Sequence, residues 1–408
     1  MKYVERCGSY LTILGVMVCV LCSNANAAEN EAHWVGVWAA APRNLPVPAS
    51  DQSMTDTTYR DVVHITMGGH AFRLRLTNEF GAAPLKMGGV HIAISAGDGA
   101  IKSGTDKRIT FGGEPATVIP DGAFVLSDPV EMDAKAFTNL AVSIFVPAQA
   151  IKVMTVHPLG NATTYIASGD GLSDVKLTNP KAVYSWYLLK GIETLADEHS
   201  AAIVTLGDSI TDGRSSTLDA NSRWPDILAT RLQNDKQLAG LSVLNAGISG
   251  NRILHDFDGP SALARFDRDV IAQSACKYLI ILEGINDIGQ TAVPKFPNQQ
   301  VGAKDIILGL EQLISRAHEH SIKVFGATII PYEGAAYYSA DGERDRQTVN
   351  SWIRTSGIFD GVIDFDKAVR DPSHPTRMLP MYDDGHHLHP NDAGYHAMAG
   401  AINLQIFH

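Results

Sequence analysis

Ser209 is the residue best suited to nucleophilic chemistry, because it stands at a polar turn that follows an apolar run, Ile203–Leu206. The turn reads Gly-Asp-Ser-Ile-Thr-Asp-Gly, and a helical pattern begins near Trp224. A strand, a tight turn that exposes a hydroxyl group and a helix are how α/β enzymes present a nucleophile. Thr211 excludes the Gly-x-Ser-x-Gly elbow. Taken alone, the segment is equally typical of an ordinary loop.

Three later segments carry polar residues of the kinds that assist such a nucleophile. They are Asn245–Arg252 and Glu283–Asp287, each after a predicted strand, and Asp383–Asp392, before the last predicted helix. The carboxyl ends of parallel strands meet at one edge of a sheet, where ligands bind. Together these segments supply a hydroxyl nucleophile, a histidine base and donors for an oxyanion, which is the set that acyl transfer requires.

Each of these residues has a chemical reason for its role. Ser209 becomes nucleophilic when a neighbour accepts its proton, and His389 suits this task because imidazole titrates near neutral pH. The oxygen that becomes negative in the tetrahedral intermediate needs fixed N–H donors. We predict that the backbone amides of Ser209 and Gly250 and the side-chain amide of Asn286 supply them. A plain turn at Gly250 and a helix cap at Asn286 explain each residue singly, but not their order after successive strands.

The four segments resemble those of the SGNH hydrolases, the GDSL esterase/lipase superfamily, in which Ser209, Gly250, Asn286 and His389 fall on the letters of the name. The resemblance covers the chain from about residue 203 to its end. The Trp-Val-x-x-Trp opening at residues 34–38 and the strand-rich first half resemble an exported bacterial subfamily of arylesterases and acetylxylan-type esterases. The resemblance implies a flavodoxin-like sheet flanked by helices, and no cofactor.

One residue departs from the pattern of that superfamily. An aspartate usually precedes the catalytic histidine by three positions, but here that position is His386. We predict that Asp384 orients His389 instead, through a bulged loop that Gly385 permits, and that Asp at position 386 would rescue the loss of Asp384. A Ser–His dyad, or a backbone carbonyl in place of the acid, is the alternative.

Metal and nucleic-acid functions find little support in the sequence. His386, His387 and His389 lie close together, but no His-Glu-x-x-His motif accompanies them, so we expect no metal site. The formal net charge is −11 and no cluster of Lys and Arg stands out, which argues against a nucleic-acid partner.

The second half of the chain alternates predicted strands with amphipathic segments. The strands are Ile203–Leu206, Ser242–Asn245, Tyr278–Leu282, Ile322–Thr328 and Val362–Asp364, and the helices are Trp224–Leu232, Asp305–His320, Arg344–Arg354 and Asp392–Ile406. Strands regularly separated by helices predict parallel pairing in a three-layer α/β/α domain, with right-handed crossovers.

The first half, from His33 to about Leu189, has the pattern of a β-sandwich. Ala71–Thr77 alternates apolar with polar residues, and Leu140–Val146 is apolar and stops at a proline. We place the domain boundary in the polar stretch Glu193–Ser200, which gives a strand-rich domain over 28–195 and a catalytic domain over 196–408. Trp34 and Trp38 are better explained by packing than by sugar stacking.

The first 27 residues have the pattern of a signal peptide. Lys2 and Arg6 precede an apolar run, Leu11–Leu21, and Ala25-Asn26-Ala27 is a small-x-small cleavage site. The run is too short to span a bilayer comfortably, so we predict an exported protein, periplasmic or released, without a membrane span. A lipoprotein signal at Cys22 is the weaker alternative, because the preceding leucine is bulky.

Removal of that peptide leaves one cysteine of four, Cys276, so no internal disulfide is expected and the thiol is predicted to be a core residue.

The leading hypothesis is a secreted serine esterase that removes short acyl groups, acetyl above all, from a polysaccharide. The loops 253–266 and 291–303 lack the apolar richness that a long acyl chain would need. The alternatives are a lysophospholipase or thioesterase, and a carbohydrate-binding protein without catalysis.

Overall fold

A fully buried strand, β20 (Ala201–Gly207), leads directly into Ser209 and lies inside a parallel sheet of five strands. The spatial order is β21-β20-β22-β23-β24, and the other strands are β21 (Leu241–Gly247), β22 (Cys276–Leu282), β23 (Lys323–Ala327) and β24 (Gly361–Ile363). In chain order this is 2-1-3-4-5, the flavodoxin-like arrangement. The computed structural model describes residues 32–51, 53–291 and 296–408. The predicted signal peptide lies outside these residues.

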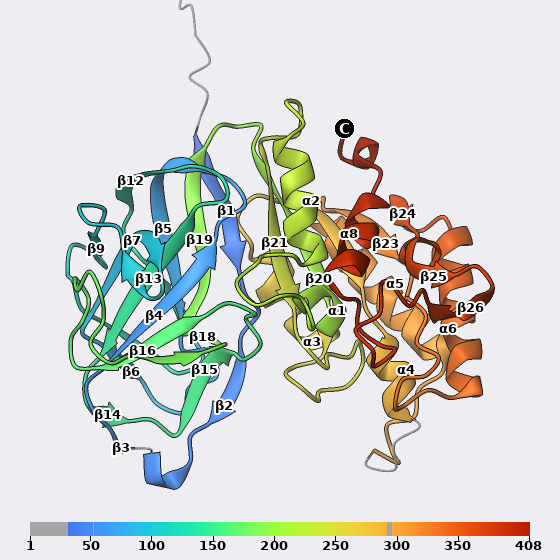
Figure 1. The fold of residues 1–408 in the computed structure, drawn as a ribbon, viewed down its shortest axis with the longest axis horizontal. Coiled ribbons are helices and arrows are strands. Elements are labelled where there is room, and N and C mark those ends of the chain that lie inside the picture. Colours follow the sequence, from blue (N-terminus) through green and yellow to red (C-terminus); the bar gives the residue numbers. More distant parts are fainter. Residues whose placement is uncertain (1–31, 52, 292–295) are drawn as a thin grey trace, which may run out of the picture. The chain divides into compact units, whose positions relative to one another are not determined.

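Helices pack on this sheet in two separate groups (Figure 1). One contains α2 (Trp224–Gln233), α7 (Phe365–Val369) and α8 (Asp392–Gly400); the other contains α3 (Ala262–Phe266), α4 (Ile285–Thr291), α5 (Ala303–Glu319) and α6 (Ala340–Thr355). The helix α5 buries Ile306, Leu310 and Leu313 at helical spacing. The predicted three-layer α/β/α class is therefore confirmed.

Short helical turns complete this half of the chain. They are α1 (Ser209–Asp212), a π-turn at Asp267–Ile271 and a 3₁₀ turn at Leu404–Phe407, and a small hairpin joins β25 (Arg370–Asp371) to β26 (His374–Met378). The last helix ends at Gly400, six residues before the predicted end at Ile406, and the 3₁₀ turn follows it.

Two antiparallel sheets form the sandwich-like first half, as predicted. The first contains β1 (His33–Ala39), β19 (Leu189–Ala196), β5 (Gly69–Thr77), β11 (Phe124–Leu126) and β12 (Val130–Ala134). The second contains β17 (Lys181–Val183), β16 (Thr164–Ser168), β4 (Thr57–His64), β13 (Asn139–Val146), β7 (Gly89–Gly97), β8 (Ala100–Ile101) and β9 (Lys107–Ile109).

Smaller strand groups lie at the margins of these two sheets. They are β2 (Arg43–Pro46) with β15 (Val153–His157) and β18 (Trp186–Tyr187), β6 (Leu85–Met87) with β10 (Thr117–Ile119), and β3 (Ser53–Met54) with β14 (Gln149–Ala150). A 3₁₀ turn spans Ala49–Asp51. Trp38 is buried edge-on against Trp186, with ring centroids 5.0 Å apart, which confirms its packing role.

The polar stretch placed at the domain boundary is partly a strand. The strand β19 continues to Ala196 and pairs with both β1 and β5. Its Glu193 is buried but forms ion pairs with Arg73 and Arg75, so a charged residue stands inside the sheet. Only residues 197–200 connect the strand-rich half to β20.

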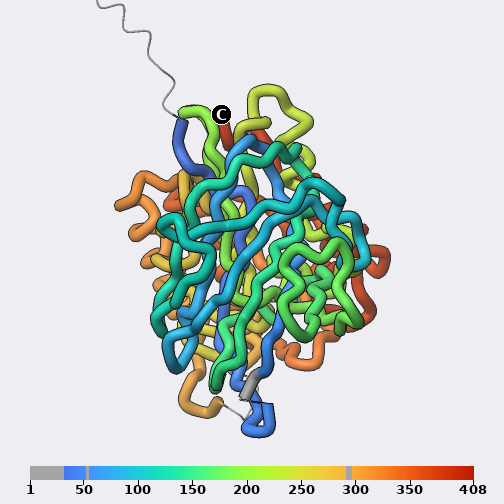
Figure 2. Tube along the Cα trace, turned by 90° about the vertical axis from the view of Figure 1, so that its left-hand side faces the viewer, coloured from blue at the N-terminus to red at the C-terminus, as the bar shows by residue number. Residues whose placement is uncertain are grey.

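The two halves share a closely packed junction and form one unit, Ala32–His408. The strand β1 lies against β21. Ser242 Oγ donates to Gly36 O at 2.5 Å, and Arg75 Nη1 donates to Ala272 O at 2.7 Å. In Figure 2 the strands of the first half, coloured blue to green, lie toward the viewer. Because of these contacts, residues of the first half lie close to the α/β half, where they can influence its loops.

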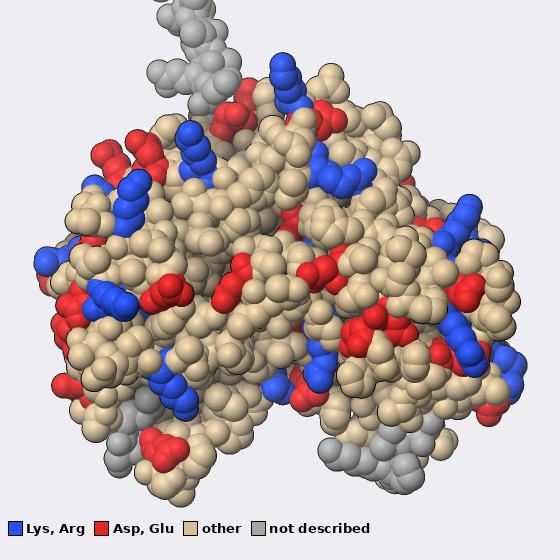
Figure 3. Space-filling view, in the orientation of Figure 1, with Lys and Arg blue, Asp and Glu red and all other residues tan. Residues whose placement is uncertain are grey.

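On the face drawn in Figure 3, Lys and Arg side chains are scattered among Asp and Glu. Among the described residues, no helix is both long and apolar enough to cross a membrane.

Cys276 is half-buried, and burial raises the pKa of its thiol to about 12, which disfavours a reactive thiolate.

Candidate active site

Ser209 is the first residue of the one-turn helix α1, at the carboxyl end of β20. The preceding Asp208 caps this turn, because its Oδ1 accepts the Ile210 amide at 2.8 Å. Ser209 is 6% exposed, so its hydroxyl lies in a largely water-excluded position. The cap and the sheet together fix the direction of the Ser209 side chain.

His389 lies on the loop before α8 and meets Ser209 across the sheet edge. Its Nε2 is 2.9 Å from Ser209 Oγ. Burial and the nearby Arg214 lower the pKa of His389 to about 4, although Asp384 opposes this shift. The ring is therefore neutral at neutral pH and can accept a proton at Nε2 while Nδ1 carries a hydrogen.

Asp384 approaches the other side of that ring. Its Oδ2 lies 3.8 Å from His389 Nδ1, close enough for an ion pair but too long for a hydrogen bond. The carboxylate is held by Ser215 Oγ at 2.6 Å and by the His386 amide at 2.8 Å. The loop bulges at Gly385, with φ of 95°. The His386 side chain is 85% exposed, and its Nδ1 lies 3.6 Å from the same Asp384 Oδ2.

Two backbone amides at the site have no acceptor within the part of the chain that is described. They belong to Ser209 and Gly250, which lie at the ends of neighbouring strands. Gly250 has φ of 81°, a conformation that side chains rarely adopt. A Cβ there would also lie 2.5 Å from Asp258 Oδ2. Glycine at this position therefore allows the amide and the Asp258 carboxylate to be close neighbours.

Asn286, in α4, is held in one orientation by two neighbours. Its Nδ2 donates to Asn251 O at 2.9 Å, and its Oδ1 accepts the Tyr337 hydroxyl at 3.3 Å. These contacts fix which end of the amide is nitrogen and leave the second Nδ2 hydrogen free. An N–H donor is thus available beside those of Ser209 and Gly250.

Arg265 ties together the strand ends that carry these groups. Its guanidinium is buried and donates to Gly207 O at 3.0 Å and to Ala246 O at 2.6 Å. Its Nε donates to Asn251 Oδ1 at 2.9 Å. One side chain therefore connects β20, β21 and the loop that contains Gly250.

The buried carboxyl groups of Asp208 and Glu283 lie near this arginine, and that of Asp287 lies near Asp208 and Glu283. Burial raises the pKa of each of them, and for Glu283 the next largest cause is the nearby Asp208. Neither carboxyl oxygen of Glu283 has a hydrogen-bond partner among the described residues. The pKa of Glu283 is raised well above its ordinary value, which favours the neutral form of this carboxyl group and limits negative charge close to an oxygen that would become anionic.

Comparison with known proteins identifies this half of the chain. Residues 205–397 match the model of the GDSL-like Lipase/Acylhydrolase family. This part of the chain belongs to the SGNH hydrolase superfamily. It is therefore a carboxylic ester hydrolase. No curated protein matches the sequence.

Several solved structures align with the SGNH half. Axe2, an acetylxylan esterase from Geobacillus stearothermophilus, is 21% identical with a TM-score of 0.40 and covers 50% of this chain and 94% of its own. A GDSL-like lipase from Bacteroides thetaiotaomicron is 21% identical with a TM-score of 0.35, over 50% and 87%. An alpha/beta hydrolase from the Lake Arreo metagenome is 21% identical with a TM-score of 0.39, over 50% and 94%.

The three histidines of the C-terminal loop of this SGNH hydrolase face different partners. His389 faces Ser209, His387 Nδ1 lies 2.5 Å from Asp383 Oδ2, and His386 is exposed to solvent. Within residues 32–51, 53–291 and 296–408, no group of His, Cys, Asp and Glu is arranged to hold a metal ion. Two of the rings nevertheless share a neighbour, because His386 Nδ1 and His389 Nδ1 lie 3.6 and 3.8 Å from Asp384 Oδ2.

Several residues at the site were not recognised in the sequence. Tyr337 orients Asn286, and Ser215 holds Asp384. His157, from the strand-rich half, contacts Asp212 in the Ser209 segment. Asp212 stands in the Gly-Asp-Ser-Ile-Thr-Asp-Gly segment and could have been singled out there. Ser215 follows that segment by two residues, whereas Tyr337 and His157 come from distant parts of the chain and carry no local signal.

Proposed function

We propose that the protein is a secreted serine esterase that removes short acyl groups, chiefly acetyl, from carbohydrate through an acyl-enzyme on Ser209. The observation that carries the proposal is the 2.9 Å contact between Ser209 Oγ and His389 Nε2, together with two backbone amides that have no acceptor among the described residues. Such a geometry joins a nucleophile, a base and oxyanion donors at one point.

In the first step Ser209 Oγ attacks the ester carbonyl carbon while His389 Nε2 accepts the hydroxyl proton. The carbonyl oxygen becomes negative and receives hydrogen bonds from the Ser209 and Gly250 amides and from Asn286 Nδ2. The carbon–oxygen bond to the alcohol then breaks, and His389 returns its proton to the leaving oxygen. The sugar hydroxyl leaves and the acyl group stays on Ser209.

Water completes the cycle by the same route. His389 removes a proton from a water molecule, and the resulting oxygen attacks the acyl carbon. The second tetrahedral intermediate uses the same donors. The bond to Ser209 Oγ breaks, Oγ regains the proton from His389, and the carboxylic acid is released. Asp384 faces the Nδ1 side of the ring, where its negative charge favours the imidazolium that forms in each half-reaction.

A polar cavity of about 220 Å³ supports carbohydrate as the alcohol. Its lining combines the Tyr165 ring with side-chain amides and carboxylates: Asn139, Asn221, Asp98 and Asp219. An aromatic face with planar polar groups around it suits sugar rings, which present both C–H faces and hydroxyl groups. The cavity is lined by both halves, and Asp219 lies on the loop that follows the Ser209 segment.

One observation favours a longer acyl group. Phe257 and Phe296 pack edge to face, with ring centroids 5.2 Å apart. Phe257 precedes Asp258, the neighbour of Gly250, so an apolar pair lies next to the oxyanion loop. A lysophospholipase or thioesterase would use such a pair to hold the acyl chain.

A panel of esters separates these functions. We expect turnover to fall as the acyl chain of p-nitrophenyl esters lengthens, and acetate to be released from acetylated xylan. The Ser209→Ala variant serves as the blank for each substrate. A preference for long chains and lysophospholipid would favour the second candidate, and binding of xylan without any ester turnover would indicate a non-catalytic protein. Recovery of protein that starts near Ala28 from the exported fraction tests secretion.

A further inference from the structure

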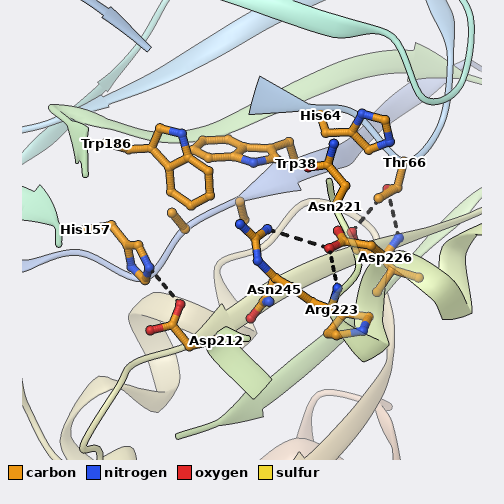
Figure 4. Close-up of a pocket in the computed structure, with 14 residues that line it drawn as sticks. Trp38, His64, Thr66, His157, Trp186, Asp212, Asn221, Arg223, Asp226 and Asn245 are labelled. Carbon is orange, nitrogen blue, oxygen red and sulfur yellow. Dashed lines mark hydrogen bonds and ion pairs between the residues drawn. The ribbon is translucent and has the colours of Figure 1, made fainter. Parts of the chain in front are cut away.

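His157 lies at the end of β15, in the strand-rich half, yet points into the SGNH half (Figure 4). It is 4% exposed. Its Nδ1 is 2.8 Å from Ala41 O and its Nε2 is 3.0 Å from Asp212 Oδ1. Asp212 is the last residue of α1, the turn that begins with Ser209. The His157 imidazole is therefore a contact between the two halves at the turn that carries the candidate nucleophile.

The contacts of that imidazole determine its protonation. The Ala41 carbonyl can only accept a hydrogen bond, so Nδ1 must carry a hydrogen. At Nε2 the neighbour is a carboxylate, whose second oxygen accepts the Ser249 amide at 2.9 Å and the Ser249 hydroxyl at 2.7 Å. With a hydrogen on His157 Nε2, both oxygens of the Asp212 carboxylate accept hydrogen bonds. Both ring nitrogens then donate, and His157 is an imidazolium paired with an Asp212 carboxylate.

A small cavity lies beside the pair of His157 and Asp212. The cavity beside it has a volume of about 20 Å³ and is lined also by Trp186, His64 and Arg223. Burial alone would lower the pKa of His157, and Arg223 also lowers it, but Asp212 and the Ala41 carbonyl together raise the pKa above its ordinary value.

The other charged neighbours of this cavity do not compete for Asp212. Arg223, at the start of α2, lies 3.7 Å from Asp226, which partly balances its charge. His64 Nδ1 is instead 2.7 Å from Asn139 Oδ1, and both residues line the polar cavity that contains Tyr165. His157 therefore supplies the cation that faces the Asp212 carboxylate most directly.

Asp212 connects the two segments that carry backbone donors. Through α1 it follows Ser209 by one turn, and through its Oδ2 it holds Ser249, the residue immediately before Gly250. Fixing the Ser249 peptide and side chain also fixes the direction of the next amide, that of Gly250. Movement of the Asp212 carboxylate would displace this amide relative to that of Ser209.

We propose that His157 is a positioning residue, supplied by the strand-rich half, whose charged contact with Asp212 keeps the amides of Ser209 and Gly250 convergent on the oxyanion. The inference rests on the proposed esterase function. It gives the first half of the chain a part in the chemistry of small esters as well as in substrate access. A small displacement of oxyanion donors lowers the rate of the chemical step more than it weakens substrate binding.

The test compares His157→Gln with His91→Gln. Glutamine at 157 keeps a donor but loses the charge. His91 Nδ1 lies 2.9 Å from Asp106 Oδ2 inside the sandwich, so its replacement removes a His–carboxylate pair far along the chain from the site. With p-nitrophenyl acetate we expect kcat of His157→Gln to fall about 10- to 100-fold, less than for complete loss of an oxyanion donor, with KM changed less than about threefold. His91→Gln should keep the wild-type kcat.

A spectroscopic measurement on the wild-type protein needs no variant to fold. Nitrogen-15 NMR at neutral pH should show hydrogens on both ring nitrogens of His157. A ring protonated only at Nδ1, or a kcat of His157→Gln equal to that of His91→Gln, would overturn the positioning role. Fluorophosphonate labelling separates the two proposals: both variants should still be labelled on Ser209, whereas a wild-type protein without that adduct would refute the esterase mechanism itself.

Discussion

Asn286 contributes to the site only in the orientation that its neighbours impose. Asn251 O and the Tyr337 hydroxyl fix the amide, so that one Nδ2 hydrogen remains for an oxyanion. Asn286→Ala should therefore reduce kcat by about 10²–10³-fold, with KM little changed. Tyr337→Phe, which releases the amide without removing it, should cost less. A rise in KM alone for Asn286→Ala would make it a substrate-binding or capping residue.

The buried position of His389 has a consequence for pH dependence. The ring must be neutral to accept the Ser209 proton, and its pKa is lowered to about 4. Activity should thus persist in mild acid, and kcat/KM should fall only as pH decreases through about 4, whereas an ordinary histidine would lose activity near pH ~6.5. A pH–rate profile on a non-ionising ester measures this. An acidic limb between pH ~6 and 7 would contradict the assigned environment.

Asp384 faces His389 without a direct hydrogen bond, so its effect should be electrostatic and moderate. We expect Asp384→Asn to reduce kcat by about tenfold, below the ~10⁴ that a complete triad loses. The Asp384 charge raises the pKa of His389, so in Asp384→Asn the acidic limb of the pH–rate profile should move to lower pH. Asp383→Asn is the matched control, because that carboxylate pairs with His387. Full activity of Asp384→Asn would favour a Ser–His dyad.

The structure changes one expectation about the same loop. The sequence suggested that Asp at position 386 would rescue Asp384→Asn, but the His386 side chain is 85% exposed. A carboxylate there would be largely hydrated, which screens its charge, so we now expect at most a partial rescue. Asp384 could be selected from the sequence because few acids lie near His389. The contacts made by Tyr337, Ser215 and His157 depend on how distant loops and the two halves pack, which no local pattern encodes.

At the scale of elements, the parallel sheet was predictable because its strands are buried on both faces. The predicted Ile203–Leu206 lies inside β20, whose seven residues are all buried. The C-terminal helix is shorter than its apolar pattern suggested, since regular helix stops at Gly400. The pairing of β1 with β19 joins segments about 150 residues apart, and strand propensity does not specify such partners.

The polar cavity of about 220 Å³, lined by residues of β4 and β16, can be tested through its aromatic residue. Tyr165 lies against Gly99, where a Cβ would be 2.8 Å from its ring, so the aromatic ring is supported from one side. Tyr165→Ala should lower kcat/KM for acetylated xylan about five- to tenfold, as expected for loss of about 1 kcal/mol of ring contact, and leave p-nitrophenyl acetate unaffected. Tyr184→Ala, exposed on the same half but outside the cavity, is the control. Equal losses on both substrates would remove the cavity from substrate binding.

At the scale of the whole molecule, the strand-rich half and the SGNH half act as one body. Arg75 reaches Ala272 O, and His157 reaches Asp212, so buried polar groups of one half are satisfied by the other. Separation of the halves would expose these groups and leave charges unpaired. We therefore expect the SGNH half to depend on the first half for its folding as well as for the proposed substrate access.

The central claim is that Ser209 carries the acyl group, and peptide mass mapping after fluorophosphonate treatment tests it most directly. We expect one adduct per chain, on Ser209, formed in step with the loss of esterase activity. Ser209→Ala should remain folded, take up no label and lose several orders of magnitude in kcat, up to about 10⁶. An adduct on another residue, or an Ser209→Ala variant that still turns over p-nitrophenyl acetate at the wild-type rate, would contradict the account.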